Sequence, residues 1–109
     1  MKIDKAYRTD AGKFTELTIR SKGFWNYGAE QIKEWRDELT ISPNYIDDNQ
    51  VYKLLFNERI IGFYAFQSEH LKTVKLNFHF VEPEFIGNGF GKLLLNDFLQ
   101  RIKNIQLSI

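Results

Sequence analysis

The sequence predicts an α+β domain with a mixed sheet and the element order β-α-α-β-β-β-α-β. Three strand-like segments follow one another between residues 51 and 81, and a helix-like segment then separates them from a last strand-like stretch. Strands joined by short turns pair antiparallel, whereas a strand–helix–strand crossover gives a parallel pair. A chain of 109 residues has the length of one domain, which we assign to residues 1–109.

The first half of the chain is predicted to form one strand and two helices. Residues 2–8 ("KIDKAYR") alternate loosely between apolar and polar side chains, which indicates a strand. Thr9 or Asp10 can cap a helix that extends to about Ser21, because a short side-chain oxygen accepts hydrogen bonds from the free N–H groups of a first turn. Apolar side chains at helical spacing predict a second helix over residues 29–39.

Turn residues and alternating segments define the middle of the chain. Residues 42–50 ("SPNYIDDNQ") are predicted to be a loop, since Pro, Asn and Asp favour turns. Residues 51–57 and 60–67 are strand-like with two residues between them, which predicts a tight hairpin. A third strand, rich in β-branched and aromatic side chains, is predicted over residues 73–81.

The last elements expected are an amphipathic helix from about Gly89 and a strand over residues 105–109. Native chains seldom end within an apolar strand, and this strand would end on Leu107 and Ile109. We therefore expect a truncated product of a longer parent. A fragment, a chain completed by a partner or a swapped subunit, and a degenerate relative are the alternatives.

Composition excludes several classes of protein. The chain has 15 basic and 14 acidic residues, and a net charge of +1 gives no long-range field to attract nucleic acid or an anionic membrane. We expect neither as a partner. The absence of cysteine excludes disulfides, thiolate metal sites and a cysteine nucleophile, and we expect no metal. The sequence shows no signal-peptide pattern and no apolar run of roughly 20 residues, so we expect a cytoplasmic protein.

A glycine-rich turn stands between the third strand and the last helix, in "VEPEFIGNGFGKLLL" (residues 81–95). Its glycines are Gly87, Gly89 and Gly91. Because glycine has no Cβ atom, an anion can approach the backbone closely, and the unpaired N–H groups of a helix N-terminus point at it. Lys92 would add a full positive charge in the first helical turn. The expected ligand is a phosphate or pyrophosphate.

Three common phosphate-binding motifs do not fit this turn. The P-loop requires Ser or Thr after Gly-Lys, and here Leu93 follows Lys92. The dinucleotide fingerprint requires the spacing G-x-G-x-x-G and an acidic residue about 20 positions later, whereas this chain has G-x-G-x-G and ends first. The kinase glycine loop precedes a strand and not a helix. The alternative is that the glycines bind nothing and only allow the chain to turn.

The motif resembles the acetyl-CoA signature of the GNAT acetyltransferase superfamily, Gln/Arg-x-x-Gly-x-Gly/Ala after a strand that ends in Val-x-Pro. Gly89 and Gly91 fall on its two glycine positions, and Val81 and Pro83 fall on the strand end. Ile86 occupies the usual Gln/Arg position and departs from the pattern. The stretch "SKGFWNYGAEQIKEW" also looks like the segment between the first two helices in one bacterial branch of the superfamily.

The resemblance implies a GNAT-like acyl-CoA N-acyltransferase fold and an enzyme that moves an acetyl group from acetyl-CoA to a primary amine by direct attack. Acetyl-CoA would be the cosubstrate, and the acceptor would be a small-molecule or peptide amine. A backbone N–H near Val81 would polarise the thioester carbonyl. The residues that the resemblance places against the cosubstrate are Phe80, Val81, Ile86, Gly87, Asn88, Gly89, Phe90, Gly91 and Lys92.

Catalytic and acceptor-binding candidates are fewer. His79 is the candidate base, since histidine ordinarily changes charge near neutral pH and strand alternation puts His79 on the same face as Val81. An ordinary half-buried strand histidine is the alternative. Trp25 and Tyr27 are candidates for the acceptor pocket, with core packing as the alternative, because the superfamily places its first helix pair there. Glu82 and Glu84 are expected to be solvent-facing turn residues.

GNAT chains usually continue past the last predicted strand into a helix and a hairpin, which carry an Asn near the pantetheine and a Tyr that protonates the leaving thiolate. We expect this chain to lack both elements. A catalytically impaired or inactive module that binds CoA or a partner protein is therefore the alternative function, and a small α+β interaction domain without a nucleotide is a third. An exposed strand edge would also allow a homodimer.

Overall fold

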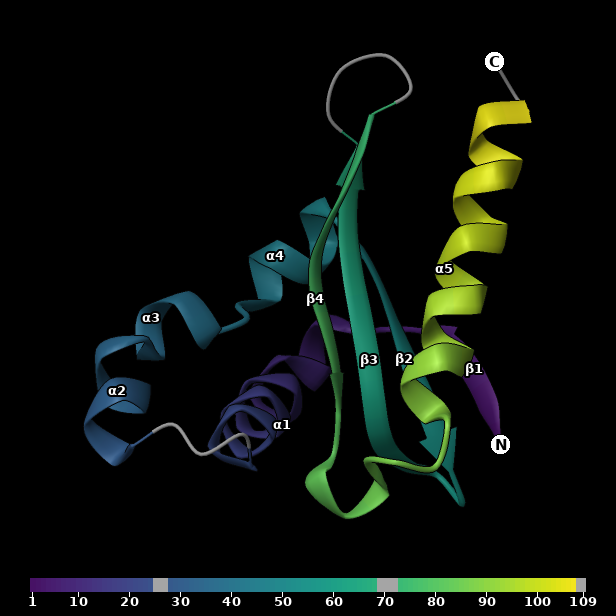
Figure 1. The fold of residues 1–109 in the computed structure, drawn as a ribbon. Coiled ribbons are helices and arrows are strands. Elements are labelled where there is room, and N and C mark those ends of the chain that lie inside the picture. The colour runs from purple at the N-terminus through teal and green to yellow at the C-terminus, as the bar shows by residue number, and fades with distance from the viewer. Residues whose placement is uncertain (25–27, 69–72, 108–109) are drawn as a thin grey trace.

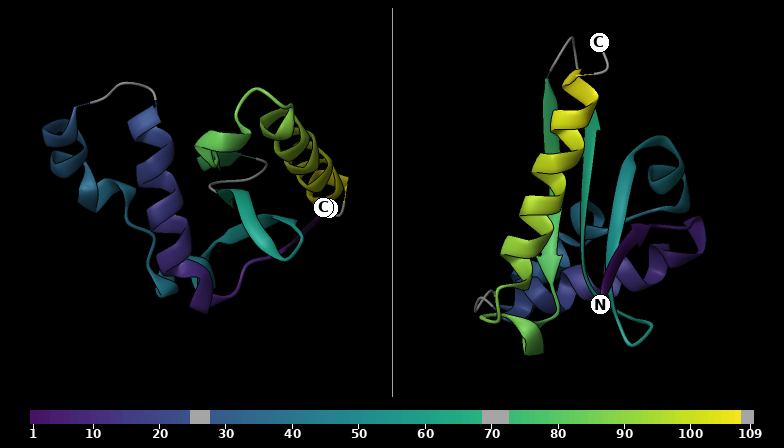
Figure 2. Two further views of the ribbon diagram at one scale, coloured as in Figure 1. Left: turned by 90° about the horizontal axis from the view of Figure 1, so that it is seen from below. Right: turned by 90° about the vertical axis from the view of Figure 1, so that its right-hand side faces the viewer.

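The computed structural model describes residues 1–24, 28–68 and 73–107, and it contains one sheet flanked by helices on both faces (Figure 1). The strands are β1 (Lys2–Lys5), β2 (Gln50–Phe56), β3 (Arg59–Ser68) and β4 (Val74–Val81), and they lie in this order. Every neighbouring pair of these described strands is antiparallel. Helix α1 (Ala11–Phe24) covers one face and crosses the strands steeply, whereas α5 (Phe90–Leu107) runs along the strands on the other face (Figure 2).

The predicted hairpin of β2 and β3 is confirmed, with a two-residue turn between Phe56 and Arg59. Asn57 and Glu58 have φ of 50° and 67°. Positive φ at both central residues is the geometry of a type I′ turn, whose twist matches that of the two strands. The third predicted strand is also present, as β4.

Strand β3 is buried on both faces and divides the core into two clusters. On the α1 face, Phe63 stacks on Phe14 with 4.5 Å between ring centroids. On the α5 face, Tyr64 lies against Phe98, which comes from α5. Because successive strand residues point to opposite faces, a strand buried on both sides reads as a continuous apolar run, as this one does.

A β-bulge near Asn77 changes the alternation along β4. Ala65 pairs with Phe78, and the next residue of β3, Phe66, pairs with Leu76, so Asn77 is the extra residue of β4. The Asn77 amide donates to the Tyr45 hydroxyl at 2.8 Å, which ties the bulge to the helix that contains Tyr45. A bulge lets two residues oppose one on the partner strand.

The predicted loop over residues 42–50 is wrong, because residues 43–48 form a helix, α4 (Pro43–Asp48). The Ser42 hydroxyl accepts a hydrogen bond from the Tyr45 N–H at 3.0 Å, and Pro43 takes the first helical position. Ser followed by Pro is a favourable helix start, since Ser caps free N–H groups and Pro presets φ. The composition of residues 42–50 therefore predicted a loop where the chain forms a short capped helix.

The second predicted helix is present but interrupted. It divides at Trp35, where ψ is 0°, into α2 (Ala29–Glu34) and α3 (Arg36–Leu39). The first helix extends beyond its predicted end at Ser21 and is preceded by a 3₁₀ turn, η1 (Arg8–Asp10). The first strand accordingly ends at Lys5 and not at residue 8.

The strand predicted over residues 105–109 is also wrong for the part that the structure describes. Residues 105–107 continue α5, and residues 108–109 lie outside the described residues. A short apolar alternation does not separate strand from helix, and adding one residue to an existing helix requires no new nucleation. The described sheet is therefore wholly antiparallel, although the predicted α+β class is confirmed.

Polar contacts join α5 to the sheet at its middle. The buried Tyr64 hydroxyl donates to Asp97 Oδ2 at 2.5 Å, and Arg101 Nε also donates to Asp97 Oδ2, at 2.8 Å. The Arg101 guanidinium lies 3.8 Å from the centroid of the Tyr52 ring. Burial, followed by the hydrogen bond to Asp97, raises the pKa of Tyr64 above its ordinary value. None of the helices formed by the described residues is long and apolar enough to cross a membrane.

Close packing of α5 on β3 requires a glycine at position 62. A Cβ atom on Gly62 would lie 3.1 Å from Leu94 Cδ1 and 3.1 Å from the Phe80 carbonyl oxygen. We expect Gly62→Ala to lower the free energy of unfolding by about 1–3 kcal/mol, because the Phe80 backbone cannot move aside easily. Gly12→Ala is the control, since no atom lies within 4 Å of the added methyl group. Urea unfolding measures both, and equal stabilities of the two variants would contradict the packing argument.

Alkaline pH provides a test of the Tyr64 environment. A raised pKa in the folded state stabilises the protein below the pKa of the unfolded phenol, about 10, and this contribution disappears as the pH rises through the folded value. We expect the free energy of unfolding to fall more steeply above about pH 10 in the wild type than in Tyr64→Phe. Tyr7→Phe, which removes a phenol from an exposed ring, is the matched control. Urea unfolding across this pH range gives the slopes.

Candidate functional site

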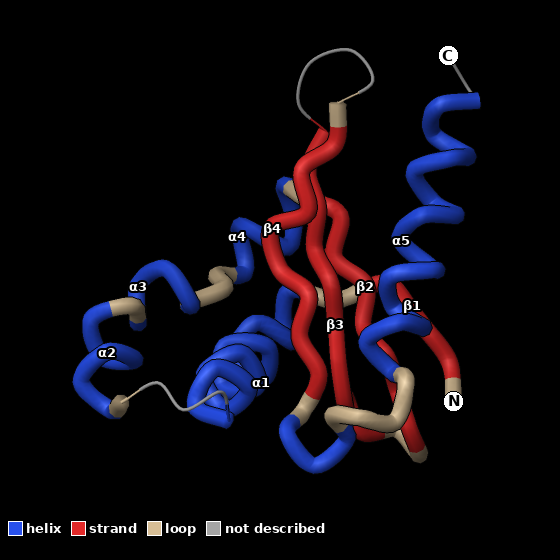
Figure 3. Tube along the Cα trace, in the orientation of Figure 1, coloured by secondary structure: helices blue, strands red, loops and turns tan. Residues whose placement is uncertain are grey.

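The chain leaves β4 through a tight turn that requires two of its glycines (Figure 3). The 3₁₀ turn η2 (Pro83–Phe85) follows β4 directly. Gly87 and Gly89 then have φ of 92° and 84°. This left-handed region is accessible to glycine without strain and disfavoured for other residues. Conformation alone therefore explains these two glycines.

Gly91 is different, because it lies inside the first turn of α5 and its φ is not positive. A Cβ atom there would meet the His79 ring at 3.9 Å, an ordinary contact. Glycine in a helix costs stability relative to alanine. Among the described residues, neither the backbone conformation nor the packing therefore requires a glycine at position 91.

The N-terminus of α5 presents free donors beside these glycines. The Leu93 N–H donates to the Gly89 carbonyl at 3.0 Å and makes the first bond of the helix. The N–H groups of Phe90, Gly91 and Lys92 precede that bond, and such groups have no partner within their own helix. They carry partial positive charge, to which the Lys92 ammonium adds a full one.

A cavity of about 310 Å³ opens beside this turn, along β4, which has no neighbouring strand on its outer side among the described residues. Helix α1 contributes Ser21 and Lys22 to one wall, and β4 contributes His79, Phe80 and Val81. The Lys22 ammonium lies 5.7 Å from the centroid of the Phe80 ring, which spans part of the gap between α1 and β4.

The turn after β4 and the start of α5 contribute Phe85, Ile86, Gly87 and Gly91 to the lining of the cavity. Six residues chosen from the sequence thus lie around one cavity: His79, Phe80, Val81, Ile86, Gly87 and Gly91. Four more, Asn88, Gly89, Phe90 and Lys92, belong to the same turn and the helix start without lining the cavity. The acceptor candidates Trp25 and Tyr27 lie outside the described residues.

His79 joins the strand to the helix start. Its Nε2 atom lies 2.8 Å from the Gly91 carbonyl oxygen. A carbonyl oxygen only accepts, so Nε2 carries the proton and donates. In the neutral ring the other nitrogen, Nδ1, then holds the lone pair that can accept a proton. Both interpretations of His79 drawn from the sequence, a base and an ordinary strand histidine, are compatible with this contact.

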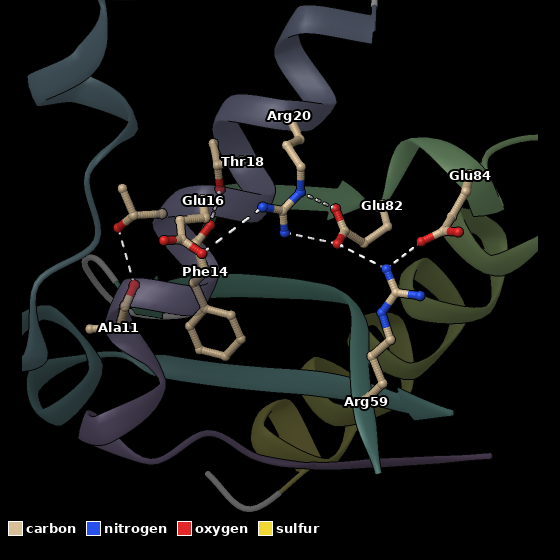
Figure 4. Close-up of polar contacts among 9 residues, drawn as sticks. Ala11, Phe14, Glu16, Thr18, Arg20, Arg59, Glu82 and Glu84 are labelled. Atoms are coloured by element: carbon tan, nitrogen blue, oxygen red, sulfur yellow. Dashed lines mark hydrogen bonds and ion pairs between the residues drawn. The ribbon is translucent and has the colours of Figure 1, made fainter. Parts of the chain in front are cut away.

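The expectation that Glu82 faces solvent is wrong. Glu82 is 4% exposed, and both of its carboxylate oxygens accept hydrogen bonds from Arg20 at 2.8 Å (Figure 4). Arg59 lies 3.5 Å from Glu82 and also pairs with Glu84, whose side chain is exposed. The hydrogen bond to Glu82 raises the pKa of the Arg20 guanidinium above its ordinary value.

Strand alternation could have identified Glu82. Phe80 packs on the α1 face, and Glu82, two residues later, continues in that direction toward α1. Sequence reasoning also missed Ser21 and Lys22, because nothing in the sequence alone shows which turn of α1 meets the end of β4. The described residues include no group of three or more His, Cys, Asp or Glu side chains that could hold a metal ion.

No family model matches the sequence, and no curated protein matches it significantly. Solved structures do resemble it. The PaiA N-acetyltransferase of Thermoplasma acidophilum, in complex with coenzyme A, superposes with a TM-score of 0.81 at 20% identity over 94% of this chain and 72% of that one. The ribosomal-protein-S18-alanine N-acetyltransferase of Escherichia coli gives 0.68 at 17% identity over 94% of this chain and 59% of that one.

A third neighbour, an acetyltransferase of the GNAT family from Staphylococcus aureus Mu50, gives a TM-score of 0.67 at 17% identity over 94% of this chain and 66% of that one. At such identities the likeness establishes the fold. The chain has the fold of the GNAT N-acetyltransferases, which confirms the fold that the sequence resemblance implies. The chain spans only 59% of the length of the Escherichia coli neighbour.

Substitution by alanine should affect stability differently at Gly89 and Gly91. We expect Gly89→Ala to lower the free energy of unfolding by about 1–2 kcal/mol, because its φ of 84° strains any residue with a Cβ atom. Gly91→Ala should keep or slightly raise the stability, because alanine is favoured in a helical turn. Thermal unfolding of the two variants tests the difference. A loss for Gly91→Ala as large as that for Gly89→Ala would show that Gly91 serves the fold after all.

Proposed function

We propose that the chain is an acetyl-CoA-dependent N-acetyltransferase that moves an acetyl group to a primary amine. The observation that carries this proposal is the cavity at the free edge of β4, which the glycine turn and the start of α5 border on one side. A CoA molecule has an anionic phosphate end and a long amide-containing arm. The free N–H groups of a helix start suit the phosphate end, and an unpaired strand edge suits the amide-containing arm.

The residues of the turn have the chemistry that the phosphate end requires. Residues 86–92 would hold the pyrophosphate through backbone N–H groups, with the Lys92 ammonium nearby. Gly91 supports this assignment, since neither its conformation nor its packing calls for a glycine. Phe80 and Val81 would bind the pantetheine arm through the backbone of the β4 edge, as an added strand does.

In the reaction, the amine nitrogen forms a bond to the thioester carbon, the carbon–sulfur bond breaks, and the sulfur leaves with its electron pair. A backbone N–H near Val81 would stabilise the charge that develops on the carbonyl oxygen. His79 would take the amine proton through Nδ1, directly or through water, because Nε2 already donates to Gly91. The thiolate that leaves takes up a proton from solvent.

The acceptor would approach from the α1 side of the cavity. Ser21 and Lys22 line that wall, and Trp25 and Tyr27 follow them closely in the sequence. This continuity supports Trp25 and Tyr27 as acceptor-binding residues of a small-molecule or peptide amine. The absence of cysteine suits a reducing compartment, which supports a cytoplasmic location.

A module that binds CoA without turnover is the second candidate. The observation that favours it is the His79 contact: the imidazole already bridges β4 and the start of α5, as a purely structural histidine would. The two candidates share the binding site and differ in the chemical step, so release of free CoA thiol in the presence of amines distinguishes them.

Binding of acetyl-CoA is the first test of both candidates. A ligand at 100 times its dissociation constant stabilises a folded protein by about 2.7 kcal/mol. For a domain of this size we expect the melting temperature to rise by about 10 °C. Gly91→Ala should reduce this rise in melting temperature, because the added methyl group would crowd the anion. Gly12→Ala lies in α1, away from the turn, and should leave the rise unchanged. A cooperatively folded wild-type chain whose melting temperature acetyl-CoA leaves unchanged would contradict the proposal.

A further inference from the structure

Glu82 carries a charge in a place where charge is costly. Its side chain is 5% exposed, and the carboxylate is held by two hydrogen bonds from Arg20. Removing a carboxylate from water is costly, and the attraction of a guanidinium, here from the half-exposed Arg20, offsets that cost only when the geometry is good. Two parallel N–H···O bonds between a guanidinium and a carboxylate are the best available geometry. A contact of this kind fixes the positions of the two elements that it joins.

Those two elements are opposite walls of the candidate cosubstrate cavity. Ser21 and Val81 line the cavity. Arg20 directly precedes Ser21 in the sequence, and Glu82 directly follows Val81. Arg20 and Glu82 themselves line a second hollow of about 550 Å³, between α1, η2 and the turn of the β2–β3 hairpin. The ion pair therefore lies just outside the cavity and joins the two walls behind it.

Residue 82 is also held through its backbone. The Glu82 N–H donates to the Ile61 carbonyl at 2.8 Å, and the Glu82 carbonyl accepts from the Phe85 N–H at 2.9 Å. The first bond keeps the end of β4 on the sheet, and the second forms the 3₁₀ turn. With the side chain tied to Arg20, the residue directly after Val81 is restrained in three directions.

The phosphate side of the cavity has a separate restraint. The His79 side chain bonds to the Gly91 carbonyl at 2.8 Å, and this contact does not involve α1. Loss of the Arg20–Glu82 pair would therefore change the gap between α1 and β4 more than the shape of the glycine turn.

We propose that Arg20 and Glu82 are positioning residues, which hold α1 against the end of β4 and so fix the part of the strand edge, at Phe80 and Val81, along which the pantetheine arm of CoA would lie. This inference rests on the proposed function, which assigns the pantetheine arm to that strand edge. Neither residue touches the reacting atoms. Their effect on binding passes through Ser21 on one wall and Val81 on the other.

The test compares CoA with adenosine 3′,5′-bisphosphate, which has a phosphate end and lacks the pantetheine arm. Calorimetric titration measures both dissociation constants for the wild type, Arg20→Met and Arg20→Lys. We expect Arg20→Met to weaken CoA binding about tenfold or more, since small misplacements of binding groups are costly, and to change bisphosphate binding less than about twofold. Arg20→Lys keeps the charge but contacts the carboxylate at a single point. Its dissociation constant for CoA should therefore lie between those of the wild type and Arg20→Met.

Glu16→Gln is the matched control. Glu16 lies on the same helix, 4.0 Å from Arg20, with a side chain that is 71% exposed, so neither dissociation constant should change. Hydrogen exchange of the ligand-free variants gives a second readout: amides of residues 81–86 should exchange faster in both Arg20 variants, and those in the middle of α5 should not. Arg20→Lys also serves if Arg20→Met does not fold.

The outcomes separate the two levels of inference. Equal weakening of CoA and bisphosphate binding, or no weakening of either, would overturn the positioning role while wild-type CoA binding still supports the proposed function. A folded wild-type chain that binds neither ligand would overturn the proposed function, and the positioning role with it. Selective loss of CoA binding with faster exchange at residues 81–86 is the result that supports the inference.

Discussion

Burial of β3 on both faces is the constraint on which the rest of the structure depends. Phe63 and Tyr64 point to opposite sides and are both inaccessible to solvent, so the sheet needs a cover on each face. Helix α1 supplies one cover and α5 the other. The chain must therefore leave β4 at the end of the sheet and reverse onto the α5 face within a few residues. The glycine turn performs this reversal, and the candidate site lies where it does so.

The same constraint explains why the glycines have different roles. Gly62 lets α5 approach β3, and Gly87 and Gly89 let the backbone reverse. Each of these three is accounted for within the chain. Gly91 is not, and it lines the candidate cavity at the start of α5. Structural causes thus account for Gly87 and Gly89, and the proposed phosphate contact would account for Gly91.

Sequence patterns predicted most of the sheet, because β3 and its neighbours carry strong alternation or continuous apolar runs and the hairpin loop has two residues. They failed where a signal is local and short. Ser42 and Pro43 start a helix of six residues inside a stretch whose composition favours turns. At the other end, the alternation over residues 105–107 is too brief to distinguish a strand from the helix that continues there.

The candidate site was predictable to a different extent. The family resemblance selected six of the residues that the fold gathers around one cavity. The α1 wall of this cavity was not predictable, because it depends on how α1 meets the end of β4, and the Arg20–Glu82 contact there joins residues about 60 positions apart. Glu82 shows the difference. Composition places a glutamate in a turn at the surface, whereas strand alternation directs this one toward α1, where Arg20 meets it.

An open cavity also changes what holds its surroundings together. Walls that pack on each other are fixed by many apolar contacts, and walls separated by a cavity lose those contacts. Around this cavity, directional bonds supplement the apolar contacts that remain: His79 ties β4 to the start of α5, and Arg20 ties α1 to the end of β4 through Glu82. Both bonds leave the strand edge free. A polar residue such as Glu82 can therefore be buried next to a binding site without binding anything itself, because the site needs a fixed width more than it needs another apolar contact.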